Sequence, residues 1–221
     1  VVGSVVQAAR VHSKRDVDEI VLLDVRASKE GRTVSEDLVR SISEFIRVPL
    51  TVGGGVTNEF QFEALLRAGA DRVCIGYNSE SSDFFFSRLS KIFGAQAVVC
   101  SLDVDSGGTN VRINSSNSWV QADLCGLLTT LEGVGVGEVL LQSVERDGTL
   151  NGLDIELISR VSAKSTLPII ASGGLSSPKD AVSAVRAGAR AVAGGAIFQF
   201  TEWTPSDIKT ALALNGYVVR S

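Results

Sequence analysis

Short apolar segments alternate with longer amphipathic segments along almost the whole chain. The apolar segments are rich in Val, Ile and Leu, which is typical of strands buried in a parallel sheet. They predict strands at Ile20–Asp24, Val48–Val52, Arg72–Gly76, Ala97–Asp103, Glu138–Gln142, Leu167–Ser172 and Arg190–Gly195. The segments between them have helical periodicity and predict helices at Val5–Lys14, Ser35–Ile46, Glu59–Ala68, Asp83–Phe93, Pro178–Ala187 and Pro205–Leu214. The Thr204-Pro205 pair is a helix-start signal for the last of these.

Strict alternation of strand and helix predicts right-handed βαβ units and a parallel sheet. A doubly wound sheet fits this pattern, but an internal repeat favours a barrel. The segment VGGGVTNEFQFEALLRAGADRVCIG, Val52–Gly76, resembles ASGGLSSPKDAVSAVRAGARAVAGG, Ala171–Gly195, at a constant offset of 119 residues. A repeat of this length exceeds the period of solenoids and indicates two duplicated half-domains. We therefore predict a (β/α)8 TIM barrel built from two duplicated half-barrels.

The repeat also predicts how the chain divides. We expect a single barrel domain over residues 1–221, with a truncated first half at 1–96 and a second half at 97–221. The offset places the counterpart of the Ala97–Asp103 strand before Val1, so the first strand of the barrel is expected to be missing from this chain. The alternative is a seven-stranded or open barrel, which would leave two strand edges unpaired.

Composition narrows the class of protein. A hydrophobic content of 44% and a mean hydropathy of +0.22 are ample for a core, and no apolar run reaches the ~18 residues of a membrane span. The net charge of −4 without charge blocks argues against nucleic acid as a partner. The three cysteines, Cys74, Cys100 and Cys125, are too widely spaced for a metal site, and they favour reduced thiols in a cytoplasmic protein. We expect no metal and no cofactor.

Glycines gather where predicted strands end, which is where barrel enzymes carry their active sites. Backbone amides of such glycines bind phosphate, helped by the positive end of the following helix. Gly173, Gly174 and Gly195 would form one cradle, and the repeat would place a second at Gly54, Gly55 and Gly76. Two cradles on opposite rims suit a substrate with a phosphate at each end. The alternative is that these glycines only make tight turns.

Charged residues mark both ends of the predicted barrel. Asp103 ends an apolar strand and either caps the next loop or performs acid–base chemistry. Glu19, Arg72 and Glu138 stand where three alternate strands start, and alternate strands contribute to one inner layer of a barrel. They could form a charged ring at the bottom of the barrel, or they could be three solvated turn residues.

Several motifs resemble the cyclase subunits of imidazole glycerol phosphate synthase, and the likeness covers nearly the whole chain. They are VDEIVLLDVRASKEGR, PLTVGGGV, RAGADRVCI, FGAQAVVCSLD, GVGEVLLQSVERDGTLNG, LPIIASGG and IFQF. The resemblance implies that ammonia from a glutaminase subunit passes through the barrel to a bis-phosphorylated formimino carboxamide ribotide. The products would be imidazole glycerol phosphate and an aminoimidazole carboxamide ribotide, in histidine biosynthesis.

The same resemblance implies roles for individual residues. Asp103 matches one of two acid–base aspartates, and the other would lie on the missing first strand. Glu19, Arg72 and Glu138 match an ammonia gate, and Asp71 matches a contact with the glutaminase. Substrate and phosphate contacts are implied for Gly55, Asp147, Gly148, Ser172, Gly173, Gly174, Gly195 and Ala196.

The chain departs from the family pattern at Cys74-Ile75-Gly76, at Gln142-Ser143 and over NSSNSW, Asn114–Trp119. Three alternatives therefore stand beside the cyclase. The first is a paralogue that amidates surface-polysaccharide sugars. The second is a non-catalytic subunit that binds bis-phosphates or the glutaminase. The third is the sister isomerase of histidine biosynthesis, which shares the duplicated barrel and the RDGT loop.

Overall fold

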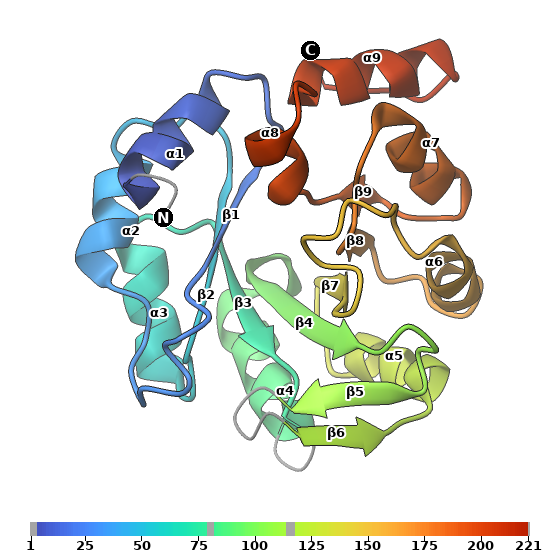
Figure 1. Ribbon diagram of the computed structural model, residues 1–221. Helices are drawn as coiled ribbons and strands as arrows, with labels where there is room; N and C mark the ends of the chain where they lie inside the picture. The colour runs from blue at the N-terminus through green and yellow to red at the C-terminus, as the bar shows by residue number, and fades with distance from the viewer. Residues whose placement is uncertain (1–3, 79–81, 114–117, 221) are drawn as a thin grey trace.

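A curved wall of parallel strands surrounded by helices forms the body of the protein (Figure 1). The computed structural model describes residues 4–78, 82–113 and 118–220. Within these residues the wall contains β1 (Ile20–Leu23), β2 (Leu50–Gly53), β3 (Arg72–Gly76), β4 (Val98–Val104), β7 (Glu138–Ser143), β8 (Ile169–Ser172) and β9 (Ala191–Val192). Each strand pairs in parallel with the next in that order. The order never reverses, so the fold is that of a (β/α)8 barrel and not of a doubly wound sheet. Over the described part of the chain, β1 and β9 are the two ends of the wall.

Helices cover the outer face of the wall. They are α1 (Val5–Ser13), α2 (Glu36–Ser43), α3 (Glu59–Arg67), α4 (Ser82–Phe93), α5 (Leu124–Gly133), α6 (Ile155–Ser162), α7 (Pro178–Arg186), α8 (Ala196–Phe200) and α9 (Pro205–Leu214), with a short 3₁₀ turn at Ala95–Ala97. Side-chain caps fix the start of several of them. Thr204 and Asp207 form a reciprocal capping box around Pro205, so the predicted start of α9 is confirmed.

The predicted strict alternation of strand and helix is wrong after β4. An antiparallel hairpin of β5 (Asn110–Ile113) and β6 (Ser118–Gln121) comes between β4 and α5, and β5 runs back along the end of β4 (Figure 1). The hairpin forms because Val111 and Ile113 alternate with polar residues and bury one face. β9 is also shorter than predicted, since Gly194 and Gly195 lead directly into α8.

The two halves of the chain repeat in space as well as in sequence. Helices α2 and α3 begin and end 119 residues before α6 and α7, and β2 stands in the same relation to β8. Gly69 and Gly188 both end their helices with positive φ angles, 110° and 111°. A Cβ atom would lie 2.3 Å from Ser43 Oγ at Gly69, and 2.5 Å from Ser162 Cβ at Gly188. The same helix–helix contact is therefore built twice, 119 residues apart.

The core has an outer and an inner part. The larger part lies between the wall and the helices and includes Leu50, Phe62 and Leu102. The smaller part fills the inside of the barrel and contains Cys74, Val99, Leu140 and Ile170, with Val21 and Ala193 packed against it. Alternating residues of each strand face inward. The polar residues at the two ends of the barrel therefore form two separate clusters, one above and one below this inner core. No helix in the described ranges is both long and apolar enough to cross a membrane.

Candidate functional site

The strand ends separate the candidate residues into two groups. At the carboxyl ends lie Asp103 and the candidate phosphate and substrate contacts: Gly54, Gly55, Gly76, Asp147, Gly148, Ser172, Gly173, Gly174, Gly195 and Ala196. At the amino ends lie Glu19, Asp71, Arg72 and Glu138. Loops at the carboxyl ends carry the active sites of barrel enzymes. The first group is therefore the candidate active site.

Asp103 faces inward near the carboxyl end of β4. On the adjacent strand β7, Gln142 is paired with Asp103. Ser101 Oγ donates a hydrogen bond of 3.4 Å to Asp103 Oδ1. Burial raises the pKa of Asp103 above its usual value. The positive charge of Arg112 and the hydrogen bond from Ser101 act against this rise, while the negative charge of Asp147 adds to it. A carboxyl group whose pKa moves toward neutrality is suited to exchange protons with a substrate.

Glycine turns follow β2 and β8. Gly54 and Gly55 have φ angles of 135° and 68°, and Gly173 and Gly174 have 93° and 97°. A Cβ atom on Gly55 would lie 1.8 Å from the carbonyl oxygen of Arg32, and one on Gly173 would lie 2.4 Å from that of Ser143. Backbone packing alone therefore requires glycine at these positions, as the tight-turn interpretation holds. The same conformation brings the turns close to the mouth of the barrel.

The other candidate contacts lie around the same rim. Gly76 is the last residue of β3 and lines a pocket of about 440 Å³ together with Thr57, Asn58 and Asn78. Ser172 is the last residue of β8 and pairs with Gln142.

Two further candidate pairs complete the rim. Asp147 and Gly148 lie in the exposed turn after β7. Gly195 comes directly before α8, which starts at Ala196, and the space beside Gly195 is open. The structure thus places all these residues at one end of the barrel, contributed by both halves of the chain.

The second group forms a charged cluster at the opposite end. Arg72 Nη1 lies 2.6 Å from Glu19 Oε2, and Arg72 Nη2 lies 3.7 Å from Glu138 Oε1. Thr51 Oγ1 donates a hydrogen bond to the other oxygen of Glu19. The side chains of Glu19, Arg72 and Glu138 are only about a quarter exposed, which contradicts the alternative of three solvated turn residues. Burial raises the pKa of Glu138, and the positive charge of Arg72 opposes that shift.

Asp71 lies beside this cluster and has a contact of its own. Its Oδ2 accepts a hydrogen bond of 2.8 Å from the amide of Leu50, and its amide donates to the carbonyl of Leu50 at 2.9 Å. Asp71 therefore joins the start of β2 to the start of β3 and remains exposed. A surface residue held in this way can also meet a partner.

Two charged groups near the mouth did not emerge from the sequence. Arg112 on β5 acts electrostatically on Asp103. Arg32 Nη1 lies 2.6 Å from Asp24 Oδ2 and lowers the pKa of that carboxyl, which fixes the loop after β1. The alternation in Asn110–Ile113 was the available signal for the β5 strand. The departure predicted over Asn114–Trp119 lies outside the described residues except for its last two positions.

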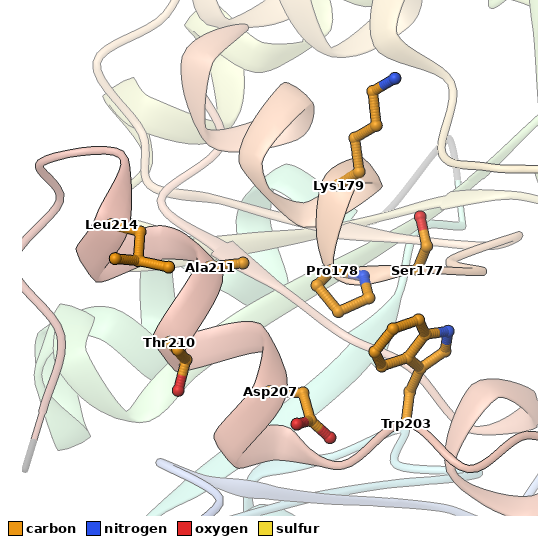
Figure 2. A pocket seen from close by; sticks show the side chains of 8 residues that line it. All are labelled: Ser177, Pro178, Lys179, Trp203, Asp207, Thr210, Ala211 and Leu214. Atoms are coloured by element: carbon orange, nitrogen blue, oxygen red, sulfur yellow. The ribbon is translucent and has the colours of Figure 1, made fainter.

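A separate pocket of about 320 Å³ lies on the outside of the barrel between α7 and α9 (Figure 2). Its lining residues are Ser177, Pro178, Lys179, Trp203, Asp207, Thr210, Ala211 and Leu214. It contains none of the candidate residues. In the part of the chain that the structure describes, no group of three or more His, Cys, Asp or Glu side chains is arranged to hold a metal ion.

Comparison with known proteins gives consistent matches along the chain. A family model described as "Histidine biosynthesis protein" matches residues 1–204. The chain is 40% identical over 227 residues to imidazole glycerol phosphate synthase subunit HisF of Corynebacterium glutamicum (strain R), covering 99% of this chain and 88% of that protein. It is 37% identical over 223 residues to the HisF subunit of Dictyoglomus turgidum, covering 100% and 88%. It is also 35% identical over 219 residues to a putative imidazole glycerol phosphate synthase subunit, hisF2, of Campylobacter jejuni, covering 99% and 88%.

Proposed function

The chain belongs to the histidine biosynthesis protein family, and on that premise we propose that it is the cyclase subunit of imidazole glycerol phosphate synthase. The observation that carries this proposal is the position of Asp103. It is an inward-facing, half-buried carboxyl group at the same end of the barrel as the glycine turns of both halves. A substrate held by both turns would extend across it.

The proposed reaction joins ammonia to a bis-phosphorylated formimino carboxamide ribotide. Ammonia adds to the ribulosyl carbonyl carbon, whose oxygen leaves as water, the imidazole ring closes, and aminoimidazole carboxamide ribotide is eliminated to leave imidazole glycerol phosphate. Proton transfers accompany both the addition and the elimination, and a positioned carboxyl group accelerates such steps. Asp103 would perform one of them. Because burial raises the pKa of Asp103, its carboxylate binds a proton more readily than an exposed aspartate does.

The two phosphates of the substrate would bind on opposite sides of this one rim. Gly173, Gly174, Ser172 and the Gly195-Ala196 pair would hold one, and Gly54, Gly55 and Gly76 would hold the other. Backbone amides at strand–helix turns provide the hydrogen-bond donors for such anions. The repeat supports this arrangement, because Gly54 and Gly55 match Gly173 and Gly174 in both position and positive φ. The Asp147-Gly148 turn would then close over the middle of the substrate.

A glutaminase subunit would supply the ammonia from the opposite end of the barrel. The proposed docking face includes Asp71, and the proposed gate is the cluster of Glu19, Arg72 and Glu138. Beyond the gate, ammonia would pass the inner core around Cys74 and Leu140, which presents no fixed charge. The three cysteines of the described residues are free thiols, in keeping with the proposed cytoplasmic location.

An ammonia-dependent turnover assay tests the proposal. The purified chain is mixed with the bis-phosphorylated substrate and ammonium chloride, and both products are separated and quantified. Formation of the two products in equal amounts, and only with ammonium, supports the cyclase. Product formation without ammonium would favour the isomerase, and tight binding of the substrate without turnover would favour a binding subunit.

A further inference from the structure

The register of the β5 strand places an arginine next to the candidate acid–base residue. β5 runs antiparallel to β4, with Val111 opposite Val104. The amide of Asp105 donates to the carbonyl of Asn110 at 3.2 Å, which continues the same register. Because the two strands run in opposite directions, one step back along β4 from Val104 corresponds to one step forward along β5 from Val111. Arg112 is therefore the residue of β5 opposite Asp103.

Burial on the two strands shows that both side chains project to the same face. Val104 and Val111 are both part of the outer core, with exposed fractions of 0% and 2%. Neighbouring residues of a strand point to opposite faces, so Asp103 and Arg112 both project away from the outer core. Residues opposite one another in a regular antiparallel pair have Cβ atoms about 5 Å apart. The hairpin thus holds a guanidinium group over the mouth of the barrel on the side of Asp103.

The charges that face Asp103 come from several elements. Among the residues that the structure describes, Arg112 on β5 is the cation that acts on the pKa of Asp103, and it lowers that pKa against the effect of burial. Asp147 in the turn after β7 acts in the opposite direction. Cys74 on β3 lies below, and burial raises the pKa of its thiol to about 12, so this thiol stays neutral. Gln142 on β7 and Ser172 on β8 complete the surroundings with neutral groups.

From this arrangement we propose that Arg112 is a positioning residue that keeps Asp103 ionised before substrate binds. The proposal deepens the proposed function, on which it rests, by assigning Asp103 the role of a base at the start of the reaction. Burial alone would favour the neutral carboxylic acid, which already carries its proton and cannot accept another from the substrate. A guanidinium group is always charged and is therefore a constant source of stabilisation for the carboxylate.

The test measures protonation of Asp103 directly and does not depend on turnover. The titration of Asp103 is followed by carbon-13 NMR of aspartate carboxyl groups, and Asp103→Asn identifies the signal. The variants are Arg112→Gln, Arg112→Met and the charge-conserving Arg112→Lys. Arg160→Gln is the matched control, because Arg160 donates to the carbonyls of Gly107 and Gly108 at 2.9 and 3.2 Å and so anchors the β4–β5 turn.

We expect both neutral variants to raise the midpoint of the Asp103 titration by about one pH unit, since an opposite charge at short range shifts a carboxyl by that order. Arg112→Lys and Arg160→Gln are expected to keep the wild-type midpoint. An unchanged midpoint in a folded neutral variant would overturn the proposal, and so would an equal shift in Arg160→Gln. If both neutral variants unfold, the midpoint of the Asp103 titration in the wild-type protein is compared between low salt and 1 M salt. Screening of Arg112 predicts an upward shift, and no shift would overturn the proposal.

Turnover measurements distinguish a failure of this proposal from a failure of the proposed function. In an active chain, the acidic limb of the pH–rate profile should move upward in Arg112→Gln and return to its wild-type position in Arg112→Lys. An inactive wild-type chain would count against the cyclase assignment alone, because the NMR titration would still report whether Arg112 controls Asp103.

Discussion

Arg72 Nη1 lies 2.6 Å from Glu19 Oε2, although 53 residues separate the two in the chain. The same guanidinium faces Glu138 at 3.7 Å, so one cation pairs with two carboxylates at the amino ends of the strands. β1, β3 and β7 are alternate strands of the barrel, and their first inward-facing positions lie in one layer. Glu19 directly precedes β1, and Arg72 and Glu138 begin the other two strands.

Removing the cation should destabilise the protein in a pH-dependent way. Arg72→Gln leaves two half-buried carboxylates facing one another, and we expect a loss of about 1–2 kcal/mol in the free energy of unfolding at pH 8. The pKa of Glu138 is already raised by burial, and removal of Arg72 raises it further. The penalty therefore fades as the pH falls and Glu138 gains a proton. Urea unfolding at pH 8 and at pH 4.5 measures it.

Arg67→Gln is the matched control for that experiment. Arg67 pairs with Glu63 at 2.6 Å within one helix, but its side chain is 79% exposed. Such pairs contribute little, so the control should change stability by less than about 0.5 kcal/mol at both pH values. Equal losses in the two variants would show that the cluster is no more buried than an ordinary surface pair.

Asp103→Asn should stabilise the fold. The pKa of Asp103 is raised above its unfolded value of 3.8, so the folded chain binds a proton more tightly than the unfolded chain. Stability contributed by this group is present at low pH and is lost as the pH rises through the folded pKa. The neutral amide avoids that loss, and we expect the Tm at pH 8 to rise by about 1–3 °C, with a smaller change at pH 4. Asp147→Asn, in an exposed turn, should leave the Tm unchanged. A Tm lowered by Asp103→Asn at pH 8 would contradict a carboxylate that burial destabilises.

The glycine turn after β2 should be intolerant of any side chain. Gly55 and Gly31 have nearly equal φ angles of 68° and 63°. A Cβ atom meets a backbone carbonyl at 1.8 Å on Gly55, whereas nothing lies within 4 Å on Gly31. We expect Gly31→Ala to cost about 1 kcal/mol through its φ angle alone and Gly55→Ala to cost about 3 kcal/mol or more. Similar midpoints of urea unfolding would show that the turn can relax around a methyl group.

The barrel could be predicted because its signals are local and occur twice. The repeat preserves cap, helix and turn at an offset of 119 residues, as the contacts of Ser43 with Gly69 and of Ser162 with Gly188 show. The charged cluster could be predicted from the order of the strands alone, because each inner layer of a barrel is made by side chains from alternate strands. Neither result depends on side-chain detail.

The hairpin and its arginine could not be predicted in the same way. Asn110–Ile113 is a short alternating segment, and its pairing with β4 is decided by tertiary contacts of Val111 with the outer core. The register with β4, which puts Arg112 beside Asp103, exists only once that pairing has formed. The glycine turns posed a different difficulty, because backbone strain and phosphate binding both demand glycine and leave the same pattern in a sequence.

A comparison of wild type and Asp103→Asn in substrate binding and in ammonia-dependent turnover tests the catalytic role of Asp103. Calorimetry with the bis-phosphorylated substrate reports binding, and quantification of imidazole glycerol phosphate reports chemistry. We expect Asp103→Asn to bind the substrate within about threefold of wild type and to lose turnover by at least about 100-fold, the usual contribution of a general acid–base group. Turnover within threefold of wild type would contradict a catalytic role for Asp103.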